Sequence, residues 1–218
     1  MESLRRQLIG MLDSPYVRRV SVALIEAKVP FQHRPFSLFR HIDQFSRINP
    51  LLKAPTLVAD QGTVLNDSSV ILDYPASAYP AVAQLTPDRS SEPPRTFCAI
   101  GLALTVMEKA VQRHYERFLR PEEKRHGFWI ERVMAQLHAG LNVLEAELPP
   151  AGWIAEALGI ADITFIRLVI GDLVETARYP NVAEFSARAE ALPAFGASPP
   201  EDAVAAPVEL AGWAAAPG

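Results

Sequence analysis

The hydrophobic positions in the first part of the chain change from a continuous run to a helical spacing. Residues 8–12 form a continuous apolar run, which is typical of a strand covered on both faces. The run ends at Asp13-Ser14-Pro15, after which apolar side chains recur every three or four positions as far as Pro30. The pattern predicts a strand, a turn and a helix that begins at Pro15, with Arg18 and Arg19 outside the apolar stripe.

The next segments predict three more strands and two more helices. Because a helix joins the first two strands, a parallel βαβ unit is the simplest arrangement of this part of the chain. The loop Asp60-Gln61-Gly62 is typical of a hairpin, and Asn66-Asp67-Ser68 supplies capping side chains for a helix. The predicted elements are a strand at 31–36, a weak helix at 40–48 before Asn49-Pro50, strands at 56–58 and 63–65, and a helix from residue 68. The predicted order is therefore βαβαββα.

The hydrophobic pattern changes again in the middle of the chain. From Pro75 to Pro94 the chain is rich in proline, alanine and serine and has no periodicity, which indicates a linker. Two helical stripes follow, one ending at Pro121 and one at Pro149-Pro150, and we expect these two helices to pack antiparallel. The first stripe is Phe97, Ile100, Leu104, Met107, Val111, His114 and Phe118, and the second is Ile130, Val133, Leu137, Leu141, Leu144 and Leu148.

The last part of the chain predicts further helices and a tail. Residues 160–174 are apolar on nearly every side, which is typical of a helix buried inside a bundle, and a short helix is predicted after Pro180-Asn181. The tail is mostly alanine, proline and glycine, which is typical of a draped or disordered segment. The predicted organisation is an α/β domain at 1–79, a linker at 80–94, an all-helical domain at 95–195 and an Ala/Pro-rich tail at 196–218.

Composition limits the classes of partner. The 218 residues are 49% hydrophobic and 21% charged, as in soluble globular proteins, and the net charge of −4 argues against nucleic acid or an anionic membrane as a partner. The single cysteine, Cys98, excludes an intrachain disulfide framework and a multi-cysteine metal site and is consistent with a reducing compartment. The basic N-terminus is not followed by a sustained apolar segment, so we expect neither a signal peptide nor a membrane span.

Several short motifs occur in a specific order and spacing along the chain. They are Ser14-Pro15-Tyr16-Val17-Arg18-Arg19-Val20, Asn49-Pro50 with Lys53-Ala54-Pro55-Thr56-Leu57, Asn66-Asp67-Ser68, Gly159-Ile160-Ala161-Asp162-Ile163, Tyr179-Pro180 and Pro193-Ala194-Phe195. Together they resemble the motifs of the cytosolic glutathione transferase family. The resemblance covers nearly the whole chain. It implies a thioredoxin-like α/β domain followed by a helical bundle, glutathione as co-substrate, no metal, a homodimer and a cytoplasmic location.

Ser14 has two interpretations that are compatible with each other. From the sequence alone it is the N-cap of a helix whose first residue is Pro15. In the serine-type members that this chain resembles most, a serine near this position faces the sulfur of glutathione. A hydroxyl donor and a helix N-terminus both favour the thiolate form of a thiol, whose ordinary pKa is about 8.5.

The resemblance assigns two further sites to the peptide part of glutathione. Ala54-Pro55 would be a cis bond that turns the backbone of residue 54 toward the cysteinyl backbone, whereas the simpler interpretation is a trans bond at a strand entry. Asp67 and Ser68 would meet the γ-glutamyl ammonium and carboxylate, whereas the simpler interpretation is helix capping. Most members carry glutamate where this chain has Asp67, so a shifted or water-mediated contact and a weaker affinity are expected.

Basic residues are the candidates for the glycine carboxylate of glutathione. The resemblance implies Lys53, just before the proline loop, and either His41 or Arg40 from the second helix region. Exposed basic residues are more commonly solvated, which is the simpler interpretation of all three.

Other polar residues are assigned to folding or left without a catalytic role. Gly159 replaces the serine or threonine that usually caps the buried helix of the family, so Asp162 is assigned to folding. Cys98 lies in the helical domain and not where thiol-transferring relatives keep their nucleophile, and the Ser-Ser-Cys motif of isomerase-like relatives is absent from the first turn. His114 is interpreted as a core or cleft residue.

The predicted function is that of a glutathione transferase, a class associated with detoxification. Its thiolate would form near Ser14 and attack a small hydrophobic electrophile lying against the helical domain. The candidates that line the electrophile pocket are Met11, Met107, Val111 and Tyr115, because the first long helix should border the cleft. The alternative is a binding or scaffold protein that keeps the fold without turnover.

Overall fold

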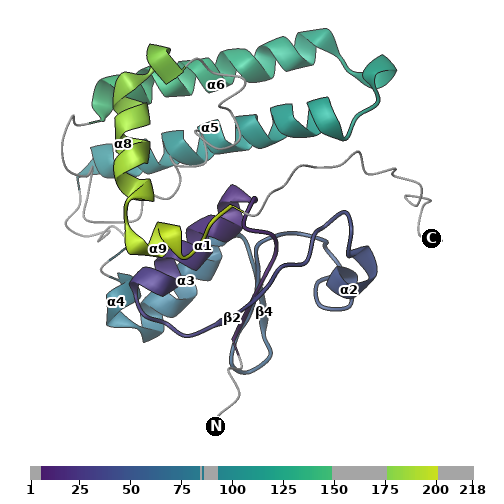
Figure 1. Cartoon of the computed structure of the whole chain (residues 1–218), viewed down its shortest axis with the longest axis vertical. Coiled ribbons are helices and arrows are strands. Elements are labelled where there is room, and N and C mark those ends of the chain that lie inside the picture. The colour runs from purple at the N-terminus through teal and green to yellow at the C-terminus, as the bar shows by residue number, and fades with distance from the viewer. Residues whose placement is uncertain (1–5, 84, 86–92, 149–175, 201–218) are drawn as a thin grey trace.

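The computed structural model describes residues 6–83, 85, 93–148 and 176–200 of the chain. An α/β unit formed by the first part of the chain packs beneath a layer of long helices (Figure 1). The predicted order βαβαββα is confirmed. Its elements are β1 (Gln7–Ile9), α1 (Pro15–Glu26), β2 (Gln32–Arg34), α2 (Ile42–Ser46), β3 (Thr56–Val58), β4 (Val64–Asn66) and α3 (Ser68–Ala78).

The four strands form one mixed sheet in the order β2-β1-β3-β4. β1 is parallel to β2, with Leu8 opposite His33, and antiparallel to β3, with Leu8 opposite Leu57. β4 completes the sheet antiparallel to β3, with Leu65 opposite Leu57. α1 and α3 lie side by side on one face of the sheet, and α2 lies on the other side of the strands in Figure 1. This is the thioredoxin-like unit that the sequence predicts.

The core of this unit lies between the sheet and the helices α1 and α3. The strands contribute Leu8 and Leu57, and both side chains are fully buried. Val17 and Leu24 of α1 and Ile71 of α3 close over them. The continuous apolar run at residues 8–12 is a strand only as far as Ile9, because Gly10 turns the chain toward α1.

The second unit is built on two long helices, α5 (Pro94–Phe118) and α6 (Gly127–Glu147), which run side by side in Figure 1. Eight residues connect them, so they are antiparallel as expected. A Cβ atom at Gly140 would lie 2.5 Å from Val106 Cγ2, so this glycine lets the two helices approach closely. The remaining described helices are α4 (Pro80–Ala83), α8 (Pro180–Glu190) and α9 (Pro193–Gly196), with 3₁₀ turns at Glu122–Lys124 and Thr176–Arg178.

The buried face of α5 differs from the predicted stripe. Phe97 and Phe118 are 40% and 46% exposed, whereas small residues such as Ala103 and Ala110 are fully buried. The alanines lie against α6, where only small side chains fit between closely packed helices, and of the predicted stripe Met107 alone is fully buried. The stripe predicted for α6 agrees better, because Val133, Leu137, Leu141, Leu144 and Leu148 are all buried.

The structure corrects the predictions for Pro75 and for the two arginines of α1. Pro75, expected at the start of a linker, lies inside α3, and Arg18 and Arg19 of α1 are buried rather than on a polar face. The predicted helix at 160–174 and the residues Gly159 and Asp162 lie outside the described residues. Within the described ranges, none of the helices combines the length and the apolar character needed to cross a membrane.

Candidate functional site

The N-terminus of α1 presents Ser14 with its side chain free of a capping role. Ser14 occupies the N-cap position, and Pro15 is the first helical residue, as predicted. The Ser14 hydroxyl makes no capping hydrogen bond, although its carbonyl accepts one from the Arg18 N–H at 2.9 Å. No acidic side chain lies in the first turn of α1 to neutralise the positive end of the helix. A hydroxyl donor and a helix N-terminus therefore coincide at Ser14.

Gly10 brings the turn before α1 into contact with the loop before β3. Its φ of +137° lies in the region that favours glycine, and a Cβ there would lie 2.6 Å from Val17 Cγ2 and 3.1 Å from Ala54 Cβ. The peptide bond Ala54-Pro55 is cis, as the resemblance implies. The start of α1 and the Ala54-Pro55 bond thus lie beside each other at the end of the sheet where β1 ends and β3 begins.

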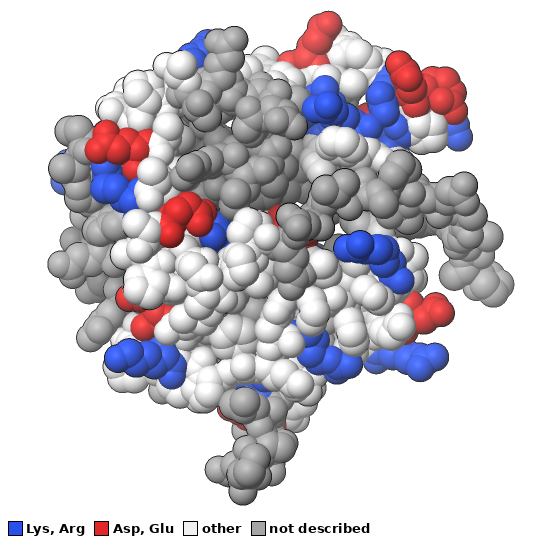
Figure 2. Space-filling model, viewed as in Figure 1, with Lys and Arg blue, Asp and Glu red and all other residues white. Residues whose placement is uncertain are grey.

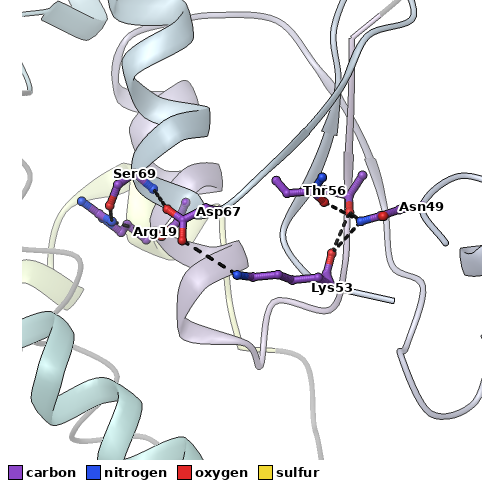
Figure 3. A network of polar contacts seen from close by, with 8 residues as sticks. Arg19, Asn49, Lys53, Thr56, Asp67 and Ser69 are labelled. Carbon is purple, nitrogen blue, oxygen red and sulfur yellow. Dashed lines mark hydrogen bonds and ion pairs between the residues drawn. The ribbon is translucent and has the colours of Figure 1, made fainter. Parts of the chain in front are cut away.

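Asn49 holds the loop that carries Lys53 and Ala54, a role that the sequence analysis missed. The side chain is only 1% exposed, and its Nδ2 atom lies 2.8 Å from Thr56 Oγ1 and 3.3 Å from the Lys53 carbonyl oxygen (Figure 3). Nδ2 also contacts Asn66 Oδ1, so this one amide joins β3, β4 and the loop between α2 and β3. The only signal in the sequence was Asn49-Pro50, which predicted a helix stop.

Replacing Asn49 by alanine is expected to lower the free energy of unfolding by about 2 kcal/mol, because it leaves buried partners without their hydrogen bonds. Urea denaturation measures this change. Asn142→Ala is the matched control, since Asn142 is an exposed residue of α6, and it should change stability by less than about 0.5 kcal/mol. Equal denaturation midpoints for the Asn49 variant and the parent would contradict the role given to this amide.

Asp67 and Ser68 open α3 in an unusual backbone conformation. Asp67 has a φ of 71°, which is rare for a residue other than glycine, and its carboxylate accepts a hydrogen bond from the Ser69 N–H at 2.9 Å. The capping interpretation of Asp67 is therefore confirmed. Lys53 Nζ lies 4.0 Å from the other carboxylate oxygen of Asp67, and both side chains are more than half exposed. This ion pair contributes little to stability but places Lys53 beside the start of α3 (Figure 3).

Arg19 reaches from α1 to the start of α3. Its Nη1 atom donates to Ser68 Oγ at 3.1 Å and to Ser69 Oγ at 3.0 Å (Figure 3). Arg19 is 7% exposed, and Ser68 is buried as well. The sequence pattern placed this arginine on a polar face, because a helical stripe gives no information on partners from another helix.

His41 and Arg40, the candidates near α2 for the glycine carboxylate of glutathione, have only local contacts in the described part of the chain. His41 precedes α2, and its Nδ1 atom accepts a hydrogen bond from the Ser37 N–H at 3.0 Å. Its ring lies beside Phe36, with ring centroids 5.8 Å apart. Arg40 is exposed. The role of His41 or Arg40 toward glutathione stays a prediction.

Tyr115 brings α5 to the α/β unit near Ser14. Its ring meets Phe39 edge to face, with centroids 5.8 Å apart, and Phe39 lies in the loop between β2 and α2. Burial raises the pKa of Tyr115, and the nearby charge of Asp13 raises it further, so the phenol keeps its proton at neutral pH. The Tyr115 hydroxyl is therefore a hydrogen-bond donor close to the turn that carries Ser14.

The other candidates for the electrophile pocket differ in exposure. Met11 lies in the turn before α1, where its carbonyl accepts a hydrogen bond from the Ser14 N–H, and its side chain is half-buried. Val111 is half-buried against the helical core. Met107 is fully buried in that core and offers no surface to a ligand in this structure. The roles of these residues stay predictions.

Two further candidates have no catalytic partner in the described part of the chain. Burial lowers the pKa of His114, the Arg117 charge lowers it further, and its ring packs 4.6 Å from that of Phe118. Cys98 is exposed on α5. Among the residues that the structure describes, no three metal-ligating side chains are grouped together. On the face drawn in Figure 2, basic and acidic side chains are interspersed, so no large patch of one sign marks this face.

Arg18, the neighbour of Arg19 on α1, connects the site to the end of the described chain. Its guanidinium donates two hydrogen bonds to the Glu190 carboxylate, at 2.6 and 2.7 Å, and a third to the Ser198 carbonyl oxygen at 2.7 Å. Phe195 stacks under the same guanidinium, 5.2 Å from ring centroid to Cζ. The helix that carries Ser14 is thus fixed against α8 and α9.

Comparison with known proteins shows which proteins the chain resembles. The model of the glutathione S-transferase N-terminal domain matches residues 8–86. A probable maleylacetoacetate isomerase of Vibrio cholerae is 28% identical over 215 residues, which cover 89% of this chain and 95% of that protein.

Two solved structures extend the likeness over both units. A glutathione S-transferase of Methylobacterium radiotolerans, in complex with glutathione sulfonate, is 28% identical with a TM-score of 0.78 over 90% of this chain and 95% of that one. A glutathione transferase family member of Pseudomonas fluorescens, with bound glutathione, is 28% identical with a TM-score of 0.76 over 90% of this chain and 99% of that one. The first unit of the chain thus matches the N-terminal domain of the glutathione transferase family, and the likeness to glutathione transferases extends over nine tenths of the chain.

Proposed function

We propose that the chain is a glutathione transferase that binds glutathione along the edge formed by Ser14, Ala54 and the start of α3. The observation that carries this proposal is the Ser14 hydroxyl, which lies at the positive end of α1 without a capping hydrogen bond. The glutathione bound in the structure of the Pseudomonas fluorescens relative supports it. A thiol placed there is favoured as thiolate by the hydroxyl donor and by the helix terminus.

Each end of the tripeptide has a proposed partner in this chain. The backbone of Ala54, before the cis bond to Pro55, pairs with the cysteinyl residue, because an extended peptide can add to exposed backbone groups. Asp67 faces the γ-glutamyl ammonium, and Ser68 faces the adjacent carboxylate. Lys53, with His41 or Arg40, is proposed for the glycine carboxylate.

The proposed chemistry is a nucleophilic attack without a covalent enzyme intermediate. The thiol gives its proton to solvent, the thiolate attacks the electrophilic carbon, a C–S bond forms, and the leaving group departs with its electron pair. The chain contributes thiolate stabilisation at Ser14 and proximity of the two substrates. We propose that Met11, Val111 and Tyr115 border the electrophile, because Tyr115 brings α5 close to the turn that carries Ser14.

A second candidate is glutathione-dependent isomerisation, which the relative from Vibrio cholerae favours through its printed name. In that reaction the thiolate adds to a double bond and leaves again, so no glutathione is consumed. The first turn here reads Asp13-Ser14-Pro15 and lacks the Ser-Ser-Cys motif of isomerase-like relatives. Conjugation is therefore the leading proposal, and glutathione consumption distinguishes the two reactions.

The homodimer and the cytoplasmic location are also proposals. Exposed large apolar side chains occur on α3, at Val70 and Tyr74, and on α5, at Phe97, and such surface is typical of an interface. Measurement of the mass in solution tests the dimer. A cytoplasmic location agrees with the use of reduced glutathione and with the unpaired Cys98.

Calorimetric titration with glutathione, followed by a conjugation assay with chlorodinitrobenzene, tests the proposed function. We expect a dissociation constant between about 1 μM and 1 mM and a linear loss of free thiol with time. Binding without turnover of any aryl halide, epoxide or unsaturated carbonyl compound would favour the scaffold alternative. Failure to bind glutathione would contradict the ligand assignments as a whole.

A further inference from the structure

We propose that His33 is a positioning residue that holds the turn carrying Ser14 in the orientation that ionises the thiol of glutathione. This inference rests on the proposed function, because it requires that a thiol binds at Ser14. His33 lies on β2, a strand at the edge of the sheet, and the proposed reaction does not otherwise use its side chain. Its ring reaches the carbonyl group of Gly10, the residue between β1 and the turn before α1.

The hydrogen bond between His33 and Gly10 has only one possible direction. The Nε2 atom of His33 lies 2.8 Å from the Gly10 carbonyl oxygen. A carbonyl oxygen only accepts hydrogen bonds, so Nε2 carries the proton and donates it. The imidazolium form of the ring also carries a proton on Nε2, so this hydrogen bond is compatible with both protonation states of His33.

β2 thus holds both polar groups of the Gly10 backbone. The Gly10 N–H donates to the Arg34 carbonyl oxygen at 3.1 Å and extends the ladder between β1 and β2 by one step. The His33 side chain supplies the donor for the Gly10 carbonyl oxygen. The ladder fixes the amide that enters Gly10, and His33 fixes the amide that leaves it toward Met11.

Close packing transmits the position of Gly10 to the start of α1. A Cβ atom at Gly10 would lie 2.6 Å from Val17 Cγ2, so the backbone of Gly10 packs directly against the first turn of the helix. The next carbonyl along the chain, that of Met11, accepts a hydrogen bond from the Ser14 N–H at 3.1 Å. The orientation of the peptide group between Gly10 and Met11 therefore determines where this short turn places Ser14.

The loop that carries Ala54 has a support of its own, so we expect His33 to affect the thiol end of glutathione and not its peptide end. The Asn49 side chain donates to the Lys53 carbonyl oxygen at 3.3 Å and to Thr56 Oγ1 at 2.8 Å. Without the donor at His33, the turn would sample other orientations while this loop stays in place. Loss of orientation at the sulfur should lower kcat more than it raises KM for glutathione.

Two amide substitutions at His33 provide the test. The side-chain nitrogen of glutamine lies close to the position of histidine Nε2, and that of asparagine lies close to the position of Nδ1, so only His33→Gln keeps a donor for Gly10. We expect His33→Asn to lower kcat for conjugation about five- to tenfold with KM for glutathione changed less than about twofold. His33→Gln should keep kcat within about twofold of the parent.

The pKa of the bound thiol is a second measurement, which the ultraviolet absorbance of the thiolate provides. It should be higher in His33→Asn than in His33→Gln, because a displaced Ser14 hydroxyl stabilises the thiolate less. Gln32→Ala is the matched control, since it removes an exposed side chain from the same strand. This control should keep both the kcat and the thiol pKa of the parent.

The outcomes separate this inference from the proposed function. If the parent neither binds nor conjugates glutathione, the proposed function fails and this inference fails with it. If the parent is active, equal kcat values in His33→Asn and His33→Gln, or a loss in Gln32→Ala as large as that in His33→Asn, would overturn the inference alone. A lower kcat in His33→Asn with the thiol pKa of the parent would overturn it as well.

Nitrogen NMR of the His33 ring in the parent keeps the inference testable if His33→Asn does not fold. A proton held on Nε2, both with and without glutathione, is the expected result, because the Gly10 carbonyl oxygen requires a donor there. A neutral ring with its proton on Nδ1 would overturn the inference.

Discussion

Replacement of Ser14 by alanine is expected to lower kcat/KM for conjugation about 10- to 100-fold, because a hydrogen bond to a charged group contributes about 1.5–3 kcal/mol. The loss should be largest near neutral pH. Without the hydroxyl donor, the pKa of the bound thiol should rise toward its ordinary value of about 8.5, so the variant should regain activity as the pH increases. A profile of kcat/KM against pH measures both the loss and its recovery.

The stability of the Ser14 variant provides the control. Because the Ser14 hydroxyl makes no capping hydrogen bond, alanine should change the free energy of unfolding by less than about 0.5 kcal/mol. Ser14→Thr keeps the hydroxyl and should retain most of the activity. An alanine variant with the activity and pH profile of the parent would show that Ser14 does not act on the thiol.

Replacement of Arg18 by methionine is expected to lower the free energy of unfolding by about 3 kcal/mol, because it leaves a partly buried carboxylate without its partner. Arg18 is 5% exposed, and its two hydrogen bonds to Glu190 at 2.6 and 2.7 Å are bidentate. The Ser198 carbonyl oxygen would lose a donor as well. Urea denaturation followed by fluorescence measures the loss.

Two further variants define the cause of this loss. Changing Glu190 to leucine together with Arg18→Met removes both charges, so the double variant should recover part of the stability. Glu184→Gln breaks the surface ion pair between Glu184 and Arg188 on α8, the helix that also carries Glu190. The Glu184 side chain is 61% exposed, so this variant should lose less than about 0.5 kcal/mol of the free energy of unfolding. Equal losses in Glu184→Gln and Arg18→Met would contradict the special position of Arg18.

Local signals in the sequence were sufficient for the order of the elements. The proline at position 15 predicted the first residue of α1, and Asp67 predicted the start of α3, because both residue types have strong positional preferences at helix N-termini. The cis bond at Ala54-Pro55 came from the resemblance alone, since a proline by itself favours the trans form.

Long-range partners were the part that the sequence could not predict. Arg18 and Arg19 look like surface residues in a helical pattern, and their burial depends on Glu190 and on the serines that open α3. The buried face of α5 was missed for a related reason, because a close helix pair selects alanine where a stripe of large apolar residues would otherwise be expected. The spacing of apolar residues indicates which face of a helix is hydrophobic, but it gives no information on how closely the neighbouring helix packs against that face.

The link between Arg18 and the end of the described chain has a consequence for synthesis on the ribosome. Its partners Glu190 and Ser198 follow it by 172 and 180 residues, so α1 emerges long before the groups that satisfy its guanidinium. Domains generally fold in order from the N-terminus as they leave the ribosome. The thioredoxin-like unit of this protein therefore acquires its last contacts only when α8 and α9 have been made, and nascent chains ending before residue 190 carry this helix without its carboxylate.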